Sequence, residues 1–467
     1  MSASPVAAFE QFNWQPQPQA QALVIDVATV FLEACSAALP FAKALKQQTG
    51  TRLIDWLDFV EVPMEGPPFP GLRTRLEATG FVLRPVEGAP IRYVNEGGVF
   101  PPFLLSEGHT LRLGLKVDSV ADFLAVHHEC EAVVEGDPLA QMRRAVVFRG
   151  RGDGFDCEMM VVKRHGWNRF DLPEPDPVRG MIALGHLEAF RLRHRDFPTD
   201  EAGLAHVHTL VDSAVSELGP DRACHLFFMA EREYWQGRNH AARVQKRRQD
   251  SLGLGWANHD HHTYRSSRCH FTQLIALWEK LGLHCRERFY AGAEAGWGAQ
   301  VMEQPVTGII TFNDVDMSPE ELLSDFAHEP MPQRAELGTV GLWCALHGEA
   351  ILQAGMHHLE CMFDWHELKE QLEHEHVRTM SPFTTFPYLR QAFTEGERWS
   401  VAPARIDRLL GAGLITDQQA EQFRRYGAVG SHLENLERND GFKGFNQQGV
   451  SEIIARTDPR KLVAAEG

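Results

Sequence analysis

The spacing of apolar residues predicts an alternation of helices and strands along most of the chain. A Pro- and Gln-rich segment over residues 1–20 is typical of a flexible lead-in. After it, the apolar residues from Leu23 to Leu32 recur at helical spacing and predict a helix over 21–48. A short apolar run over 51–60, followed by Pro- and Gly-rich connections, then favours strands.

After His109, the pattern predicts a strand, then a helix and then further strands. The predicted elements are strands at 111–117, 145–148 and 156–162 and a helix at 120–128. A turn over 150–154 joins the last two strands, and the Pro-rich run around 173–177 ends this half. The order indicates a βαβββ unit. A helical connector is expected over 184–250, clearest from Ala223 to Arg248, where one side is apolar and the other charged.

The same order is expected twice more after the connector. The predicted elements are a His-rich strand within 256–268, a helix at 269–281, strands at 285–290, 296–303, 307–312, 339–346 and 355–360, a helix at 365–374, a helical insert at 402–425 and a strand at 430–437. The pattern therefore predicts an α+β fold of tandem βαβββ modules. The expected parts are a lead-in (1–20), a first half (21–183), the connector (184–250) and a second half (251–467).

Composition and charge exclude several function classes. The 467 residues carry a formal net charge of −17, which opposes broad nucleic-acid binding, and the basic run Arg243–Arg248 is typical of one solvated helix side. No stretch approaches 18 consecutive apolar residues and no signal peptide is recognisable, so we expect a cytoplasmic protein without a membrane span. The eight cysteines contain no Cys-x-x-Cys pair, which favours reduced thiols.

The stretch from Trp256 to Arg268 is the richest in histidine and arginine side chains. If it forms a strand, His259, His261, Thr263 and Arg265 share one face, and Asp260, His262 and Tyr264 share the other. An imidazole nitrogen on the first face is a candidate metal ligand, and the planar guanidinium of Arg265 is a candidate to bind an anionic substrate. Exposed or hydrogen-bonded polar residues at a strand edge are the competing interpretation.

Two imidazoles and one carboxylate form a common non-haem iron site, and the chain offers candidates for all three. They are His261 on the first strand, His358 in the second repeat and Glu434 on the last strand. His259 competes with His261, and His357 competes with His358, because only one of two adjacent strand residues faces the metal. Glu437 is expected on the face opposite Glu434.

Three motifs carry a resemblance to a known family. Asp260-His261-His-Thr-Tyr-Arg265 resembles the Asp-His-x-x-x-Arg strand of the 2-oxoadipate dioxygenase/decarboxylase family, an iron-dependent branch of the vicinal oxygen chelate superfamily. Met356-His357-His358-Leu359 is similar to its second motif, and the segment from Leu433 to Gly441 is similar to its last strand. The resemblance covers roughly residues 250–455. In this chain, about 250 residues precede the first histidine, whereas the family places it near the N-terminus.

The resemblance implies a fold, a cofactor and a substrate class. It implies paired vicinal oxygen chelate modules and an Fe(II)-dependent dioxygenase/decarboxylase acting with O2 on a small 2-oxo or 2-hydroxy acid, whose carboxylate Arg265 holds. A non-redox isomerase or lyase using Zn2+ or Mn2+ and a metal-free binding protein are the alternatives. The expected partner is a small carboxylate substrate, and neither nucleic acid nor membrane binding is expected. Formation of a homodimer is left open.

Further candidate residues have less specific signals. Gln300, after a Gly-Trp-Gly turn, and Arg438, four residues after Glu434, are candidate substrate-binding residues. His347 lies in a His-Gly-Glu turn and is either a turn residue or a substrate-side residue. The first half is interpreted as a copy without metal, with Trp56 in the place of His261 and Met160 in the place of Glu434.

Overall fold

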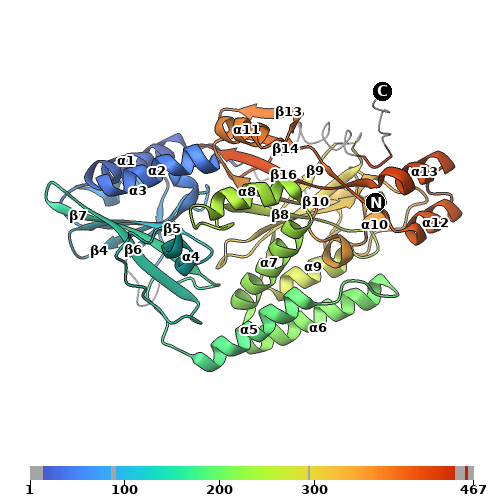
Figure 1. Ribbon diagram of the computed structural model, residues 1–467, viewed down its shortest axis with the longest axis horizontal. Helices are drawn as coiled ribbons and strands as arrows, with labels where there is room; N and C mark the ends of the chain where they lie inside the picture. Colours follow the sequence, from blue (N-terminus) through green and yellow to red (C-terminus); the bar gives the residue numbers. More distant parts are fainter. Residues whose placement is uncertain (1–13, 86–90, 293–294, 447–457, 461–467) are drawn as a thin grey trace, which may run out of the picture.

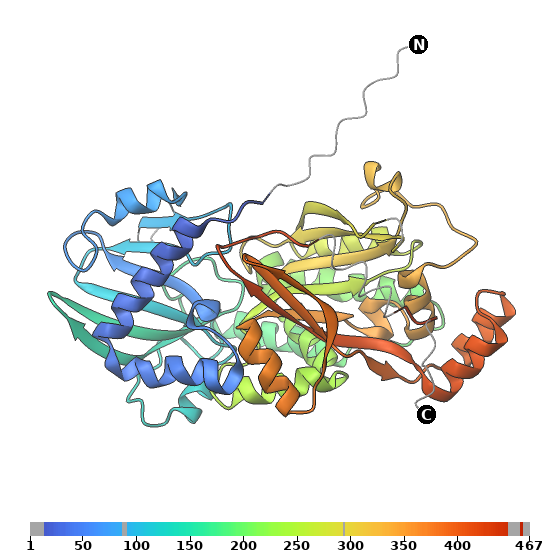
Figure 2. The ribbon, with the colours of Figure 1, turned by 90° about the horizontal axis from the view of Figure 1, so that it is seen from above.

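The protein is α+β, with one mixed sheet in each half and helices between them, as the sequence predicted (Figures 1 and 2). The computed structural model describes residues 14–85, 91–292, 295–446 and 458–460. In Figure 1 the first half lies at the left and the second half at the right. Most of the predicted lead-in, residues 1–13, lies outside the described residues, and the first helix begins at Pro18.

The second half contains two βαβββ modules in one sheet. Its strands and helices are β8 His259–Arg265, α9 Phe271–Lys280, β9 His284–Tyr290, β10 Trp297–Glu303, β11 Ile310–Asp316, α10 Thr339–His347, β12 His358–Met362, α11 Trp365–His374, β13 Thr379–Phe386, β14 Leu389–Thr394, β15 Glu397–Trp399, α12 Pro403–Gly411, α13 Asp417–Tyr426 and β16 Ala428–Arg438. The strand order is β13-β14-β16-β12-β8-β11-β10-β9, with β15 paired to β16. The first strands of the two modules, β8 and β12, therefore lie side by side at the centre and run antiparallel.

The first half repeats this topology with seven strands in place of nine. Its elements are α1 Pro18–Ala34, α2 Leu39–Ala44, β1 Leu57–Pro63, α3 Leu72–Ala78, β2 Val82–Leu83, β3 Ile91–Val94, β4 Phe103–Ser106, β5 Thr110–Lys116, α4 Val120–Val126, β6 Met142–Gly152 and β7 Phe155–Arg164. The strand order is β2-β3-β4-β1-β5-β7-β6. By connection and pairing, β1 corresponds to β8, β5 to β12 and β7 to β16.

Four connector helices cover one face of the second sheet. They are α5 Pro177–Leu192, α6 Asp200–Leu218, α7 Pro220–Gly237 and α8 His240–Asp250. On β8, His262 and Tyr264 point to this side, where their rings contact Phe228 of α7 at centroid distances of 5.0 and 6.2 Å. Because these apolar contacts occupy one face, His261, Thr263 and Arg265 are left for the other. The predicted alternation is thus correct from residue 261 to 265.

Two local predictions were wrong. Thr339–His347 is the helix α10, not a strand, because eight of its nine residues are buried all round and the apolar run carries no helical period. His259 does not share the face of His261, because the pairing of β12 with β8 shifts register between Glu360 and Cys361 and turns the His259 ring onto His262.

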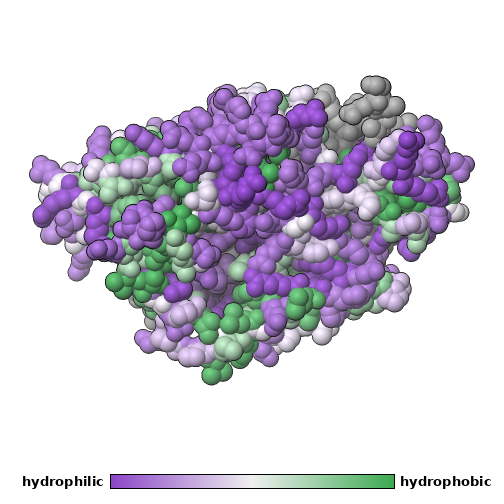
Figure 3. Space-filling model, viewed as in Figure 1, coloured by the Kyte–Doolittle hydropathy of each residue, from purple (hydrophilic) through white to green (hydrophobic). Residues whose placement is uncertain are grey.

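The surface is mostly hydrophilic on the face that Figure 3 shows. Apolar residues gather along the lower edge of this face, where Figure 1 places α5. In the described part of the chain no single helix is long and apolar enough to cross a membrane; the pair Pro18–Ala34 and Ser36–Thr49, bent by 104°, meets the length and composition criteria only together. The basic run of α8 takes part in ion pairs, including Arg247 with Glu375 at 2.8 Å and Lys246 with Asp250 at 2.6 Å.

Candidate metal site

Three adjacent strands place ionisable side chains in rows across the face of the second sheet opposite the connector helices. His261 of β8 pairs with Glu360 of β12, which pairs with Glu434 of β16. Since paired residues of neighbouring strands project to the same side, these three side chains form one row. One ligand atom of each lies within 4.8 Å of the others, and all three residues are buried.

His261 is oriented by a carboxylate and an arginine. Its Nδ1 lies 2.8 Å from Oδ2 of Asp260, and the guanidinium of Arg438 contacts both Asp260 oxygens at 2.7 and 3.0 Å. Burial alone would raise the pKa of Asp260, but Arg438 and the His261 hydrogen bond lower it below its usual range. An ionised Asp260 accepts a hydrogen bond from Nδ1 of His261, which leaves Nε2 directed at the rest of the row.

Nε2 of His261 lies beside a carboxyl group. Nε2 of His261 lies 3.0 Å from Oε1 of Glu360, and Nε2 of His358 contacts the same oxygen. His358 Nε2 is also 3.5 Å from Oε2 of Glu434. The predicted residues His261, His358 and Glu434 are therefore brought together, with the carboxylate of Glu360 between them.

Glu360 and Glu434 form a buried carboxylate pair. Burial raises the pKa of Glu360 well above its usual range, and the charge of Glu434 raises it further. Burial also raises the pKa of Glu434, although its hydrogen bonds and the nearby His261 oppose the shift. Glu360 accepts a hydrogen bond from Thr263 at 2.9 Å, and Glu434 accepts one from Gln391. Two adjacent buried carboxylates need a cation or a shared proton.

The row borders a small cavity of about 40 Å³. Aromatic side chains form much of its wall: Phe289, Trp297, Phe312, Phe393 and Phe445. Arg265 lies in the same cavity, with Nε 3.6 Å from Oδ2 of Asp314. Burial raises the pKa of Asp314 to about 8 even though Arg265 opposes the shift. The cavity thus combines an apolar wall, a carboxylate pair and one guanidinium.

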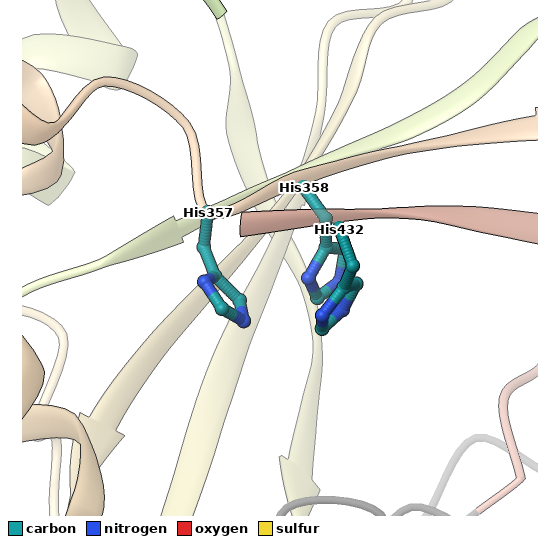
Figure 4. Close-up of side chains that lie close together, drawn as sticks. All are labelled: His357, His358 and His432. Atoms are coloured by element: carbon teal, nitrogen blue, oxygen red, sulfur yellow. The ribbon is translucent and has the colours of Figure 1, made fainter. Parts of the chain in front are cut away.

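Three imidazole rings, including that of His358, lie beside the carboxylate pair. His357, His358 and His432 are close enough for one nitrogen of each to lie within 4.8 Å of the others. Figure 4 shows the three rings on the same side of the strands, with the His357 ring turned toward the other two. Burial lowers the pKa of all three, for His432 to about 3, so they are neutral. The expectation that only one of His357 and His358 reaches the metal side was wrong, because His357 precedes β12 and is not bound by strand alternation.

Several polar atoms at the cavity have no hydrogen-bond partner among the described residues. They are Nε2 of His357, Nδ1 of His358, both ring nitrogens of His432, Oε2 of Glu360, Nε of Arg265 and Oδ1 of Asp314. Buried polar groups are normally hydrogen-bonded, so such a gathering in one cavity marks a place where a ligand completes the interactions.

Three of the predicted substrate-binding residues do not line this cavity. Gln300 points to the other face of β10 and donates to the carbonyls of Glu287 and Val301. His347 ends α10, with Nε2 3.2 Å from the Val429 carbonyl oxygen. The guanidinium of Arg438 donates a hydrogen bond to the carboxylate of Asp260. Arg265 does line the cavity, and its contact with a substrate stays a prediction.

Glu360 and His432 are the site residues that sequence reasoning missed. A usable signal was present, because alternation on a strand puts His358 and Glu360 on one face and His432 and Glu434 on one face. Glu437 takes the opposite face, as predicted, where it accepts a hydrogen bond from the Trp365 amide at 2.8 Å.

The corresponding row of the first half contains no metal ligand. Arg164 contacts Asp58 at 2.6 Å as Arg438 contacts Asp260, and each arginine follows the row residue of its strand by four positions. This places Phe59, rather than Trp56, in the position of His261, while Met160 takes the position of Glu434, as the sequence indicated. The residue between them is Gly114. Phenylalanine, glycine and methionine leave this row without a metal ligand.

Comparisons with known proteins give structural similarity only. No protein-family model and no curated protein matches the chain. The chain is similar to a putative hydrolase from Shewanella frigidimarina (14% identity, TM-score 0.31, 45% of this chain and 94% of that one). It is also similar to methylmalonyl-CoA epimerase from Mycobacterium tuberculosis (12%, 0.23, 39% and 88%) and to a mutant of 4-hydroxymandelate synthase from Streptomyces coelicolor (11%, 0.29, 86% and 98%).

Proposed function

We propose that the chain is a metal-dependent enzyme, and specifically an Fe(II)-dependent dioxygenase/decarboxylase acting on a small 2-oxo or 2-hydroxy acid. The ion would bind Nε2 of His261 and the carboxylates of Glu360 and Glu434, with His358 beside them as a fourth candidate ligand. The observation that carries the proposal is the 3.0 Å distance between Nε2 of His261 and Oε1 of Glu360, next to a second buried carboxylate. A divalent cation between these atoms would replace repulsion by attraction.

The residues around the ion would have different roles. Asp260 and Arg438 hold the ring of His261 in one tautomer and orientation, which also makes Nε2 a stronger ligand. Arg265 would bind the substrate carboxylate through its planar fork, since its Nε has no hydrogen-bond partner among the described residues. The aromatic wall excludes water from the reacting atoms. Iron, when bound, would supply the redox chemistry with O2.

A non-redox isomerase or lyase is the second candidate, and a specific observation favours it. The row contains two carboxylates and one imidazole, and oxygen-rich ligand sets suit Mn2+ better than sets of two imidazoles do. On this alternative the ion acts as a Lewis acid, and Glu360 or Glu434 moves a proton on the substrate.

Metal analysis combined with O2 uptake tests the proposal. We expect the purified protein, loaded anaerobically with Fe2+, to consume O2 and release CO2 with at least one member of a panel of small 2-oxo and 2-hydroxy acids. His261→Ala should lose the ion and the O2 uptake, whereas His347→Gln, which changes a buried imidazole outside the row, should keep both. Tight Mn2+ or Zn2+ with turnover but no O2 uptake would favour the isomerase or lyase. No metal binding at all would refute both enzyme functions.

A further inference from the structure

The three imidazoles of His357, His358 and His432 form a cluster that the proposed iron site does not require. The rings of His358 and His432 stack at 4.6 Å, and the His357 ring meets them edge-on at 4.7 and 4.8 Å (Figure 4). His357 and His358 are adjacent at the start of β12 and His432 lies on β16, so two separate backbone segments place the three rings. All three line the same cavity as the carboxylate pair.

Hydrogen bonds occupy one nitrogen of two of the rings. Nδ1 of His357 lies 3.0 Å from the carbonyl oxygen of Gly430, which can only accept, so Nδ1 bears the proton and Nε2 the lone pair. Nε2 of His358 contacts the carboxyl groups of Glu360 and Glu434, which leaves Nδ1 as the nitrogen without a partner among the described residues. Nε2 of His357 and Nδ1 of His358 are both buried and have no partner in the described chain.

His432 has no hydrogen bond at either ring nitrogen within the described residues, although the residue is only 3% exposed. A buried histidine that only packs in a core normally satisfies at least one nitrogen. An imidazole held between His358 and Phe393 with neither nitrogen satisfied is therefore ready to bind something that enters the cavity.

We propose that His357, His358 and His432 bind a second divalent metal ion, of the zinc class, beside the ion held by His261, Glu360 and Glu434. Three imidazoles and an open fourth position are a common ligand set for Zn2+. Nitrogen ligands about 2.0–2.1 Å from a tetrahedral ion lie about 3.4 Å apart, and one ring nitrogen of each histidine already lies within 4.8 Å of the others. Rotations of the rings would close the site.

The charges around the cluster permit the ion. Arg265 is the nearby cation that opposes it, and the carboxylate of Asp314 lies 3.6 Å from that guanidinium. On the other side, Glu360 and Glu434 contact His358 and bring two carboxylates next to the proposed position. The fourth position of the ion would face the cavity, where a carboxylate oxygen of a substrate is the chemically matched ligand.

Metal stoichiometry of the full-length protein tests the second site. After chelator treatment, the protein is dialysed against Zn2+ and, in parallel, Co2+; bound metal is counted by mass spectrometry and the Co2+ absorption spectrum reports its ligands. We expect two ions per chain in the wild type and one in His432→Phe, a substitution that removes no hydrogen bond within the described chain. His357→Gln should give the same loss. His347→Gln is the matched control, and it should retain two ions.

A variant of the first site separates this proposal from the proposed function. In Glu434→Gln we expect one remaining ion with a tetrahedral Co2+ spectrum. If the wild type binds one ion that His432→Phe removes and Glu434→Gln keeps, the second site stands and the first fails. One ion that His432→Phe keeps, or one ion that both variants lose, overturns the second site, because the histidines would then bind nothing or only complete a single merged site.

Discussion

Replacing Glu360 by glutamine removes one charge of the buried carboxylate pair and keeps its shape. Without metal, the wild-type pair is unfavourable at neutral pH, because burial and the neighbouring carboxylate raise the pKa of both groups. Two unit charges about 4 Å apart interact by about 4 kcal/mol at an effective dielectric constant of about 20. Partial protonation relieves some of this, so we expect Glu360→Gln to stabilise the metal-free protein by about 2 kcal/mol at pH 8.

The pH dependence has a defined sign. A carboxyl group whose pKa is raised by folding binds its proton more tightly in the folded state, so its stabilising contribution is complete below the unfolded value of about 4.3. That contribution is lost as the pH rises toward the folded pKa. The chelated wild type should therefore be less stable at pH 8 than at pH 5. In Glu360→Gln this difference should shrink, and only the contributions of other groups such as Asp314 should remain.

Thermal and urea unfolding of chelated protein, with and without added Mn2+ or Fe2+, provides the assay. For a unit of roughly 200 residues, about 2 kcal/mol corresponds to about 4–8 °C in Tm. Metal should stabilise the wild type by about 2.7 kcal/mol at a concentration 100 times its Kd, and Glu360→Gln much less. Glu437 lies on the opposite face of β16, so Glu437→Gln is the control for the loss of a buried carboxylate. A variant less stable than chelated wild type at pH 8 would refute the reasoning about the pair.

Three other predictions address neighbouring parts of the structure. Asp260→Asn should weaken metal binding by about 10–100-fold without abolishing it, because it loosens the orientation of His261; equilibrium dialysis measures this. Small carboxylates should bind more tightly as the pH falls through about 8, where protonation of Asp314 leaves Arg265 unpaired, and Asp314→Asn should remove this dependence in calorimetric titrations. Gly114→Ala should destabilise the first half by about 1–3 kcal/mol in urea unfolding and leave metal content unchanged, because a Cβ there would lie 2.4 Å from Cε1 of Phe59.

The strand that carries His261 could be predicted because its two faces differ in chemistry. On β8 the side chains of His262 and Tyr264 pack on helices, and those of His261 and Arg265 line the cavity, so alternation alone assigned the faces correctly. The assignment failed at His259, where a register shift that depends on the partner strand changes the alternation. Strand pairing is a tertiary property, and the sequence of one strand does not contain it.

Glu360 was missed for a different reason. Sequence reasoning searched for two imidazoles and one carboxylate, and the adjacent pair His357-His358 met that requirement, so the carboxylate two residues later was not considered. Only the pairing of β8, β12 and β16 shows that Glu360, not His358, stands in the same row as His261 and Glu434. Which residues of three distant strands share a row depends on register, and register is fixed by the assembled sheet.

The first half indicates that this fold does not need the ionisable row for its stability. Where the second half has His261, Glu360 and Glu434, the first half has Phe59, Gly114 and Met160, and the Phe59 ring occupies the space above Gly114 and meets Phe170 edge-on at 5.5 Å. The pair of Arg164 with Asp58 remains, so that ion pair belongs to the scaffold. Apolar packing thus fills this row in the same topology without ionisable side chains. Because folding alone would favour such a row, the buried carboxylates and imidazoles of the second half are best explained by the ligand that they bind.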